Sequence, residues 1–259
     1  MRSSKFVFIL FTLVISNVAF ASGGFTWLSH IAHLIHVEEH IVTFAFVGIL
    51  LLVLGLIYRS SVSSAGNALI PDSGTSLRNI FDSIGGVMYT QCKSIIGEKE
   101  GPKYFPFICT IFFLILISNL IGIIPGFLPP TENLNTTLAL GAFSFFYFNC
   151  MGCKEMGTVN YLKHFAGPVW YMAVLIFPIE ILSTCIRPLS LALRLRGNMF
   201  GDHLVLGIFS DLVPYVVPVI FLVMGILVSV IQAFVFTILT MVYIGLAVAH
   251  HDHDEEHAH

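Results

Sequence analysis

The sequence predicts an all-α polytopic membrane protein, and three observations carry this prediction. Hydrophobic residues make up 56% of the 259 residues and charged residues only 10%, whereas soluble domains carry about 25% charged residues. The mean hydropathy is +0.89. Uncharged runs long enough to cross a bilayer as α-helices recur along the chain. We expect about five membrane helices, the last two long and tilted as a hairpin, and an amphipathic helix on the cytoplasmic face.

The N-terminus, residues 1–21, has the pattern of a secretory signal peptide. Arg2 and Lys5 form a positive start, residues 6–15 are apolar, and Ala19 to Ala21 offer a small-residue cleavage site. The alternative, an uncleaved signal anchor, stays open. Cleavage would leave a mature N-terminus outside the cytoplasm, beginning near Ser22.

Residues 22–249 then form one integral membrane domain, followed by an acidic, His-rich tail at 250–259. Pro214 and Pro218 mark the break between the last two spans, which are too long for upright helices of about 20 residues. The predicted spans are the uncharged runs Ile41–Tyr58, Tyr104–Thr131 and Asn133–Cys153, a fourth region from Phe165 that charges interrupt, and Leu212–Ala249.

The distribution of Lys and Arg predicts the orientation, because cytoplasmic loops are enriched in both. The 59–103 loop carries five of these residues, the 154–164 loop carries Lys154 and Lys163, and the 127–134 turn carries none. The first two loops are therefore expected inside and the turn outside. Within the first loop, apolar residues at helical spacing follow the N-cap candidates Thr75 and Ser76 and predict the amphipathic helix: Leu77, Ile80, Phe81, Ile84, Val87 and Met88.

The fourth region contains an arginine, Arg194, within an apolar stretch. Inserting a charged side chain at the centre of a membrane helix costs roughly 2.5–3.5 kcal/mol. On an ideal helix Glu180, Arg187 and Asn198 fall on the same side as this arginine, whereas Arg196 and His203 fall on the opposite side. Arginine keeps its proton at any physiological pH. The pattern therefore predicts a fixed positive charge that holds a mobile carboxylate and blocks a direct proton leak. The alternative is an arginine that snorkels to the interface.

These residues resemble one family, subunit a of the F-type ATP synthase. The resemblance covers residues 105–245 and is carried by three runs in the family's order: Pro130-Thr-Glu-Asn-Leu-Asn-Thr-Thr137, Glu180-Ile-Leu-Ser-Thr-Cys-Ile-Arg-Pro-Leu-Ser-Leu-Ala-Leu-Arg194-Leu-Arg-Gly-Asn-Met199, and Ile231-Gln-Ala-Phe-Val-Phe-Thr-Ile-Leu-Thr-Met-Val-Tyr243.

The resemblance implies a stator channel of a bacterial inner membrane, beside a rotating ring of c subunits and held by peripheral-stalk b subunits. Arg194 would meet each ring carboxylate. Asn198, His203 and Gln232 would line the half-channel open to the periplasm, and Glu180 the one open to the cytoplasm. The transported ion would be H⁺, with Na⁺ as the alternative. No cofactor or metal is implied, and the chain alone is not expected to make or hydrolyse ATP.

The chain departs from some bacterial members of that family at three positions. It has His203 where they have Glu, Gly225 where they have His, and Arg196 where many have an apolar or small residue. His203 is therefore expected to act alone or with Asp202. No role is carried over to Arg196.

Two other functions compete with this interpretation. A secondary ion transporter would also place Arg and Glu at the midplane, but inverted repeats are expected there, and none is evident in the sequence. A purely structural membrane subunit leaves Arg194, Glu180 and Gln232 without a task. A nucleic-acid partner is excluded, because the 12 Lys and Arg form no basic patch among the aromatic residues.

Overall fold

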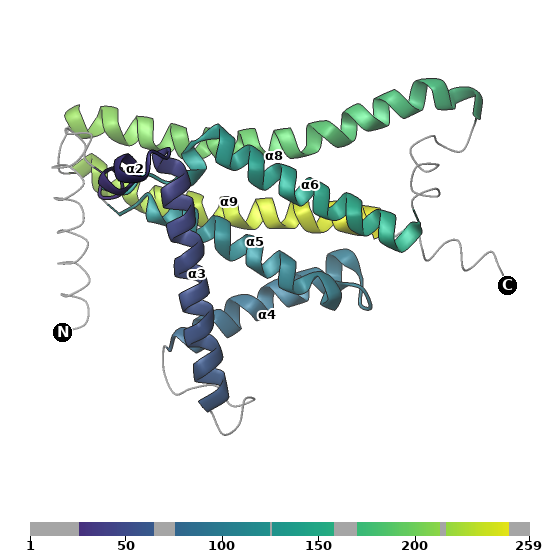
Figure 1. Ribbon diagram of the computed structural model, residues 1–259, viewed down its shortest axis with the longest axis horizontal. Helices are drawn as coiled ribbons and strands as arrows, with labels where there is room; N and C mark the ends of the chain where they lie inside the picture. The colour runs from purple at the N-terminus through teal and green to yellow at the C-terminus, as the bar shows by residue number, and fades with distance from the viewer. Residues whose placement is uncertain (1–25, 65–75, 125, 158–169, 213–215, 249–259) are drawn as a thin grey trace. The chain divides into compact units, whose positions relative to one another are not determined.

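A computed structural model describes residues 26–64, 76–124, 126–157, 170–212 and 216–248. Every regular element in this part of the chain is a helix, as Figure 1 shows, and the prediction of an all-α protein is confirmed. The elements are α2 (Ser29–Ile35), α3 (Glu39–Ser64), α4 (Leu77–Ile96), α5 (Gly101–Ile121), the 3₁₀ turn η1 (Pro130–Glu132), α6 (Leu134–Met156), α8 (Trp170–Leu212) and α9 (Val216–Val248). The predicted signal peptide and the tail lie outside the described residues.

Among the described residues, four helices are long and apolar enough to cross a membrane: Glu39–Val62, Gly101–Ile121, Ile176–Phe209 and Val219–Val248. They match the predicted first, second, fourth and fifth spans. The predicted third span forms α6, a helix of 23 residues that is not among the four. The polar residues Asn135, Thr136, Thr137, Asn149 and Lys154 lower the hydropathy of this helix.

The last two helices are much longer than an upright span requires. α8 has 43 residues and α9 has 33, which correspond to about 65 and 50 Å at the α-helical rise, against about 30 Å of hydrocarbon. α8 continues through Pro178 and Pro188 and ends at Leu212. Pro214 lies outside the described residues, whereas Pro218 belongs to the first turn of α9, where proline is tolerated.

α4 is the amphipathic helix predicted in the 59–103 loop. It begins after Ser76, whose side chain accepts a hydrogen bond from the backbone N–H of Arg78, and it ends at Gly97 with φ +123°. Met88 and Cys92 are buried, while Leu77 and Val87 on other faces are exposed. The helix is confirmed; its place on the cytoplasmic face stays a prediction.

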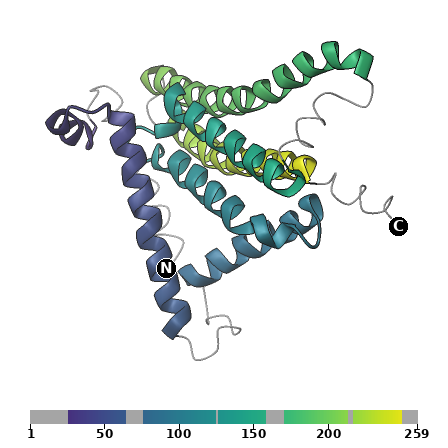
Figure 2. The ribbon, with the colours of Figure 1, turned by 45° about the vertical axis from the view of Figure 1, so that its right-hand side comes forward.

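The chain divides into two compact units, and the site lies in the first. This unit comprises the described residues up to Leu54 with 113–137 and 193–234. In it the C-terminal part of α8 runs beside the N-terminal part of α9, as Figure 2 shows from a second direction. The second unit comprises 55–112, 138–192 and the rest of α9.

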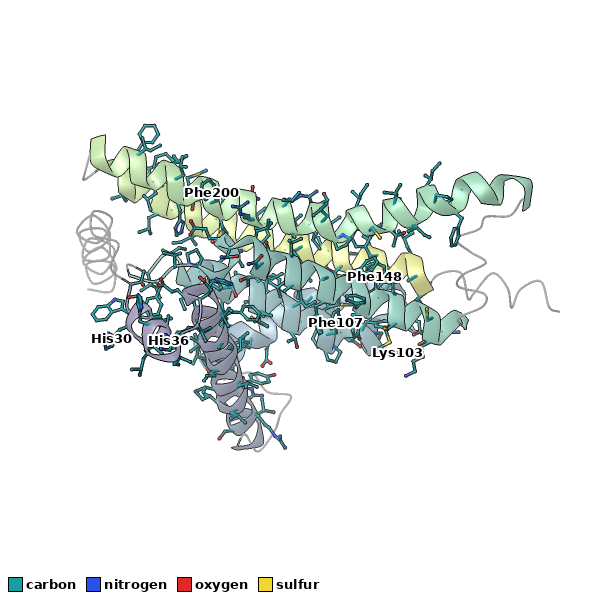
Figure 3. All side chains as sticks on the ribbon, turned by 45° about the horizontal axis from the view of Figure 1, so that its top comes forward. His30, His36, Lys103, Phe107, Phe148 and Phe200 are labelled. Atoms are coloured by element: carbon teal, nitrogen blue, oxygen red, sulfur yellow. The ribbon has the colours of Figure 1, made fainter. Side chains whose placement is uncertain are left out.

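Aromatic side chains hold the helices of the second unit together. Phe107 of α5 stacks on Tyr147 of α6 with ring centroids 3.4 Å apart, and Phe148 of α6 lies 5.9 Å from Tyr243 of α9. Figure 3 labels Phe107 and Phe148 in this packing. Offset or tilted ring pairs add roughly 0.5–1.5 kcal/mol beyond the area they bury.

The histidines before the first span do not share one continuous helix. α2 has only seven residues and ends at His36, whose φ of 55° is left-handed, and α3 begins three residues later at Glu39. Figure 3 labels His30 and His36 on this segment. His30 and His33 are exposed on α2, whereas His40 belongs to α3.

Candidate functional site

Arg194 lies on an exposed, largely apolar face of α8. Leu195 and Met199 are almost fully buried and fix the opposite stripe of the helix. The guanidinium is exposed, and its neighbours Leu193 and Phe200 are 48% and 47% exposed. Within the part of the chain that the structure describes, Arg194 makes no hydrogen bond or ion pair.

One turn further along α8, Asn198 contacts the glutamine of α9. Its Nδ2 donates a hydrogen bond to Oε1 of Gln232 over 2.6 Å. The Gln232 side chain is buried, and its Nε2 has no acceptor among the described residues. Spacing of four residues places Asn198 on the same helix face as Arg194. The structure thus joins two of the predicted site residues directly and places the fixed charge beside them.

His203 lies about two and a half turns beyond Arg194, on the opposite face of α8, and contacts a residue that the sequence did not single out. Its Nδ1 is 3.5 Å from Oε2 of Glu132 in η1, and the two side chains are 29% and 23% exposed. Burial raises the pKa of Glu132 from its ordinary value, and the charge of Arg196 opposes this shift. The sequence carried a usable signal, since Glu132 is an isolated carboxylate between two long uncharged runs.

The turn that carries Glu132 is held by polar contacts on both of its sides. Pro129 and Pro130 restrict the backbone at its start. The hydroxyl of Thr131 donates to Oδ1 of Asn119 near the end of α5, over 2.8 Å and with both residues buried. On the other side, Asn133 Nδ2 lies 3.2 Å from Nδ1 of His40. Glu132 is therefore fixed opposite α8.

Asp202 occupies the space that the small residue of α9 leaves open. A Cβ built on Gly225 would lie 2.7 Å from Oδ2 of Asp202, so this carboxylate lies against the α9 backbone. At this position some bacterial members of the resembled family have histidine. Here the polar group comes from α8 instead, next to His203.

Glu180 and Arg187 belong to the second unit. Glu180 lies within α8, but its side chain is outside what the structure describes. Arg187 places its guanidinium 5.4 Å from the ring centre of Tyr243 in α9, a cation–π contact. The role of Glu180 in the half-channel open to the cytoplasm therefore stays a prediction. Arg187 has a packing role within the second unit.

Comparison with known proteins decides the family. Residues 40–245 match the family described as ATP synthase A chain. The chain belongs to this family. It is 45% identical to ATP synthase subunit a of Bdellovibrio bacteriovorus over 89% of the chain and 100% of that protein. It is also 45% identical to that of Geobacter sulfurreducens, over 75% of the chain and 82% of the relative, and 41% identical to that of Sorangium cellulosum, over 80% and 83%.

Family membership confirms the resemblance found in the sequence and gives the broad function. The chain is a multi-pass membrane protein and the proton-conducting stator subunit of the membrane sector of ATP synthase. Catalysis of ATP synthesis resides in the soluble sector of that complex, not in this subunit. The secondary-transporter alternative is thereby set aside.

Proposed function

We propose that this chain provides two half-channels in a bacterial inner membrane, which pass protons to and from the carboxylates of a rotating c ring. Peripheral-stalk b subunits would hold it against rotation. The observation that carries the proposal is Arg194, an exposed arginine that lies on an apolar face of a membrane helix and pairs with no side chain among the described residues. Such a face needs an apolar partner, and such a charge needs a carboxylate.

The exposed face around Arg194 supports a docking surface for that ring. Its apolar members come from the halves of α8 and α9 that lie in the first unit, and each is about 40–60% exposed: Leu193, Phe200, Leu204, Ile208, Val223, Leu227, Val230 and Ile231. Because the ring would present uniform apolar helices with one carboxylate each, this surface would slide along it while Arg194 meets the carboxylates in turn.

The electrostatics of the contact allow both capture and release. Two unit charges about 4 Å apart interact by roughly 4 kcal/mol at an effective dielectric of about 20. This is enough to bias a ring carboxylate to ionise as it approaches Arg194. Once the carboxylate regains a proton, the attraction is lost and the ring moves on. The guanidinium keeps its own proton throughout, so it separates the two half-channels.

The remaining site residues then supply the two paths. Asn198, Gln232 and His203 would line the half-channel open to the periplasm, and Glu180 the half-channel open to the cytoplasm. The hydrogen bond between Asn198 and Gln232 supports this grouping for the outer side. Amide and imidazole groups hold ordered water and exchange protons with it near neutral pH.

The test is Arg194→Ala in the complete ATP synthase reconstituted into vesicles. We expect the complex to assemble with its c ring but to lose ATP-driven proton pumping and ATP synthesis. Arg194→Lys should also fail, since lysine loses its proton more readily when desolvated and lacks the planar fork. Arg59→Ala, at an exposed position of α3, is the matched control and should pump normally. An assembled Arg194→Ala complex that couples proton flow to synthesis would overturn the proposal.

A further inference from the structure

Glu132 is a carboxylate held in a fixed position opposite α8. The neighbouring residues anchor its turn through the Thr131–Asn119 hydrogen bond and the Asn133–His40 contact. Its Oε2 is inaccessible to solvent and has no hydrogen-bond donor among the described residues, with His203 Nδ1 3.5 Å away. A buried acceptor without a donor is costly. Oε2 of Glu132 is therefore expected either to take up a proton itself or to pair with a protonated group such as the imidazolium of His203.

The other charged and titratable groups around Glu132 and His203 come from two helices, α8 and α3. Arg196 of α8 acts on Glu132 from the same side as His203, and Asp202 precedes His203 and contacts the backbone of Gly225. His40 of α3 reaches the turn through Asn133. α9 has no Asp, Glu, Lys, Arg or His, so it adds no charge to the pair.

A cavity lies beside the start of α3, next in the chain to the residue that contacts this turn. A cavity of about 380 Å³ is lined by polar side chains of α2 and the start of α3, among them Ser29, His33, His36, Glu38 and Glu39. His40 follows this lining directly and contacts Asn133, the residue after Glu132. The His40–Asn133 contact thus links the segment that lines the cavity with the turn that carries Glu132.

We propose that Glu132 is a further proton-relay residue of the outer half-channel, which takes protons from the outer water and passes them to His203. This inference rests on the proposed function. Uptake of a proton forms an O–H bond on Glu132. Transfer breaks this bond and forms an N–H bond at Nδ1 of His203, which leaves a carboxylate facing an imidazolium. Release of the Nε2 proton toward the ring carboxylate leaves a neutral imidazole with its proton on Nδ1, and a flip of the ring then turns the unprotonated nitrogen toward Glu132 for the next transfer.

The experiment measures ATP synthesis by the reconstituted complex while the pH of the outer compartment is varied and the inner pH is held constant. The carboxylate stabilises the protonated imidazole beside it. We therefore expect Glu132→Gln to shift the half-maximal outer pH down by about one unit and, because an amide cannot take up the proton and pass it on, to lower the maximal rate as well. Glu132→Asp keeps the charge and should preserve the parent profile. Glu98→Gln, which removes an exposed carboxylate of the other unit, should change nothing.

A second background tests whether the two residues act together. In a His203→Gln complex, Glu132→Gln should cause no further shift, since the imidazole that the carboxylate serves is absent. An unchanged profile in Glu132→Gln, or an equal shift in the His203→Gln background, would overturn the inference. If Glu132→Gln prevents assembly, the comparison of Glu132→Asp with the parent decides, and a shifted profile there contradicts the relay.

The outcome for the proposed function is read separately from the same preparations. If Arg194→Ala abolishes coupling and Glu132→Gln leaves the profile unchanged, only the relay through Glu132 is refuted. If Arg194→Ala still couples, the half-channel proposal itself is refuted.

Discussion

Replacing Gln232 by leucine separates the contribution of this residue to stability from its contribution to proton transport. The change removes the 2.6 Å hydrogen bond from Asn198, worth about 1 kcal/mol net. It also removes the buried Nε2, which has no acceptor within the described residues; an unmade hydrogen bond costs about 1–3 kcal/mol, and water bound to this amide in the channel offsets part of that cost. Leucine is similar in size, so no large cavity forms. The free energy of unfolding of Gln232→Leu should therefore be unchanged or higher than that of the parent by up to about 2 kcal/mol.

Transport should respond in the opposite direction. The amide of Gln232 is proposed to hold water in the outer half-channel, and leucine cannot. Losing a hydrogen bond to a charged or developing-charge group costs about 1.5–3 kcal/mol, so we expect ATP-driven pumping to fall about tenfold or more. Pumping is followed by acidification of inverted vesicles, and stability by the thermal midpoint of the purified complex.

A matched change in the same helix calibrates the stability measurement. Leu222 of α9 is buried, and Leu222→Ala should cost about 2–5 kcal/mol because it leaves a cavity. If Gln232→Leu lowers the thermal midpoint as far as Leu222→Ala does, the Asn198–Gln232 hydrogen bond stabilises the fold by more than the buried Nε2 costs. If Gln232→Leu pumps at the parent rate, the residue has no part in the channel.

Three more predictions concern packing, pH and topology. A Cβ on Gly141 would lie 2.7 Å from the backbone oxygen of Pro188, so Gly141→Ala should destabilise the fold by about 1–3 kcal/mol and lower the thermal midpoint. Gly207 has open space around it, so Gly207→Ala should be neutral or stabilising. Burial raises the pKa of Glu132 in the folded state, so the folded chain binds this proton more tightly than the unfolded chain, and stability should fall as pH rises from the ordinary carboxyl pKa through the raised one. Glu132→Gln should flatten that slope in thermal midpoints taken across this window, and an equally steep slope would contradict the assignment. Ser83 is exposed on α4, and a Ser83→Cys probe in a Cys-free chain should react with an impermeant reagent only from the cytoplasmic side; labelling from the periplasm would reverse the topology.

The sequence alone determined the class of protein, the membrane helices and the family. Hydropathy is a sum over neighbouring residues, so the long runs that became α3, α5, α8 and α9 are visible without a fold. The cap at Ser76 is equally local, since the side chain satisfies a backbone N–H only two residues away. Arg194 could be singled out for the same reason: a charge within an apolar run is anomalous wherever the helix packs.

Only the tertiary structure decided which polar residues meet. Helical angles placed Asn198 beside Arg194, but they could not show that its amide reaches Gln232 on α9, because that contact depends on how α8 and α9 pack. The pairing of His203 with Glu132 depends on a turn between α5 and α6, held by Asn119 and Thr131. Such contacts join residues far apart in the chain, so their geometry follows from helix packing and not from local spacing.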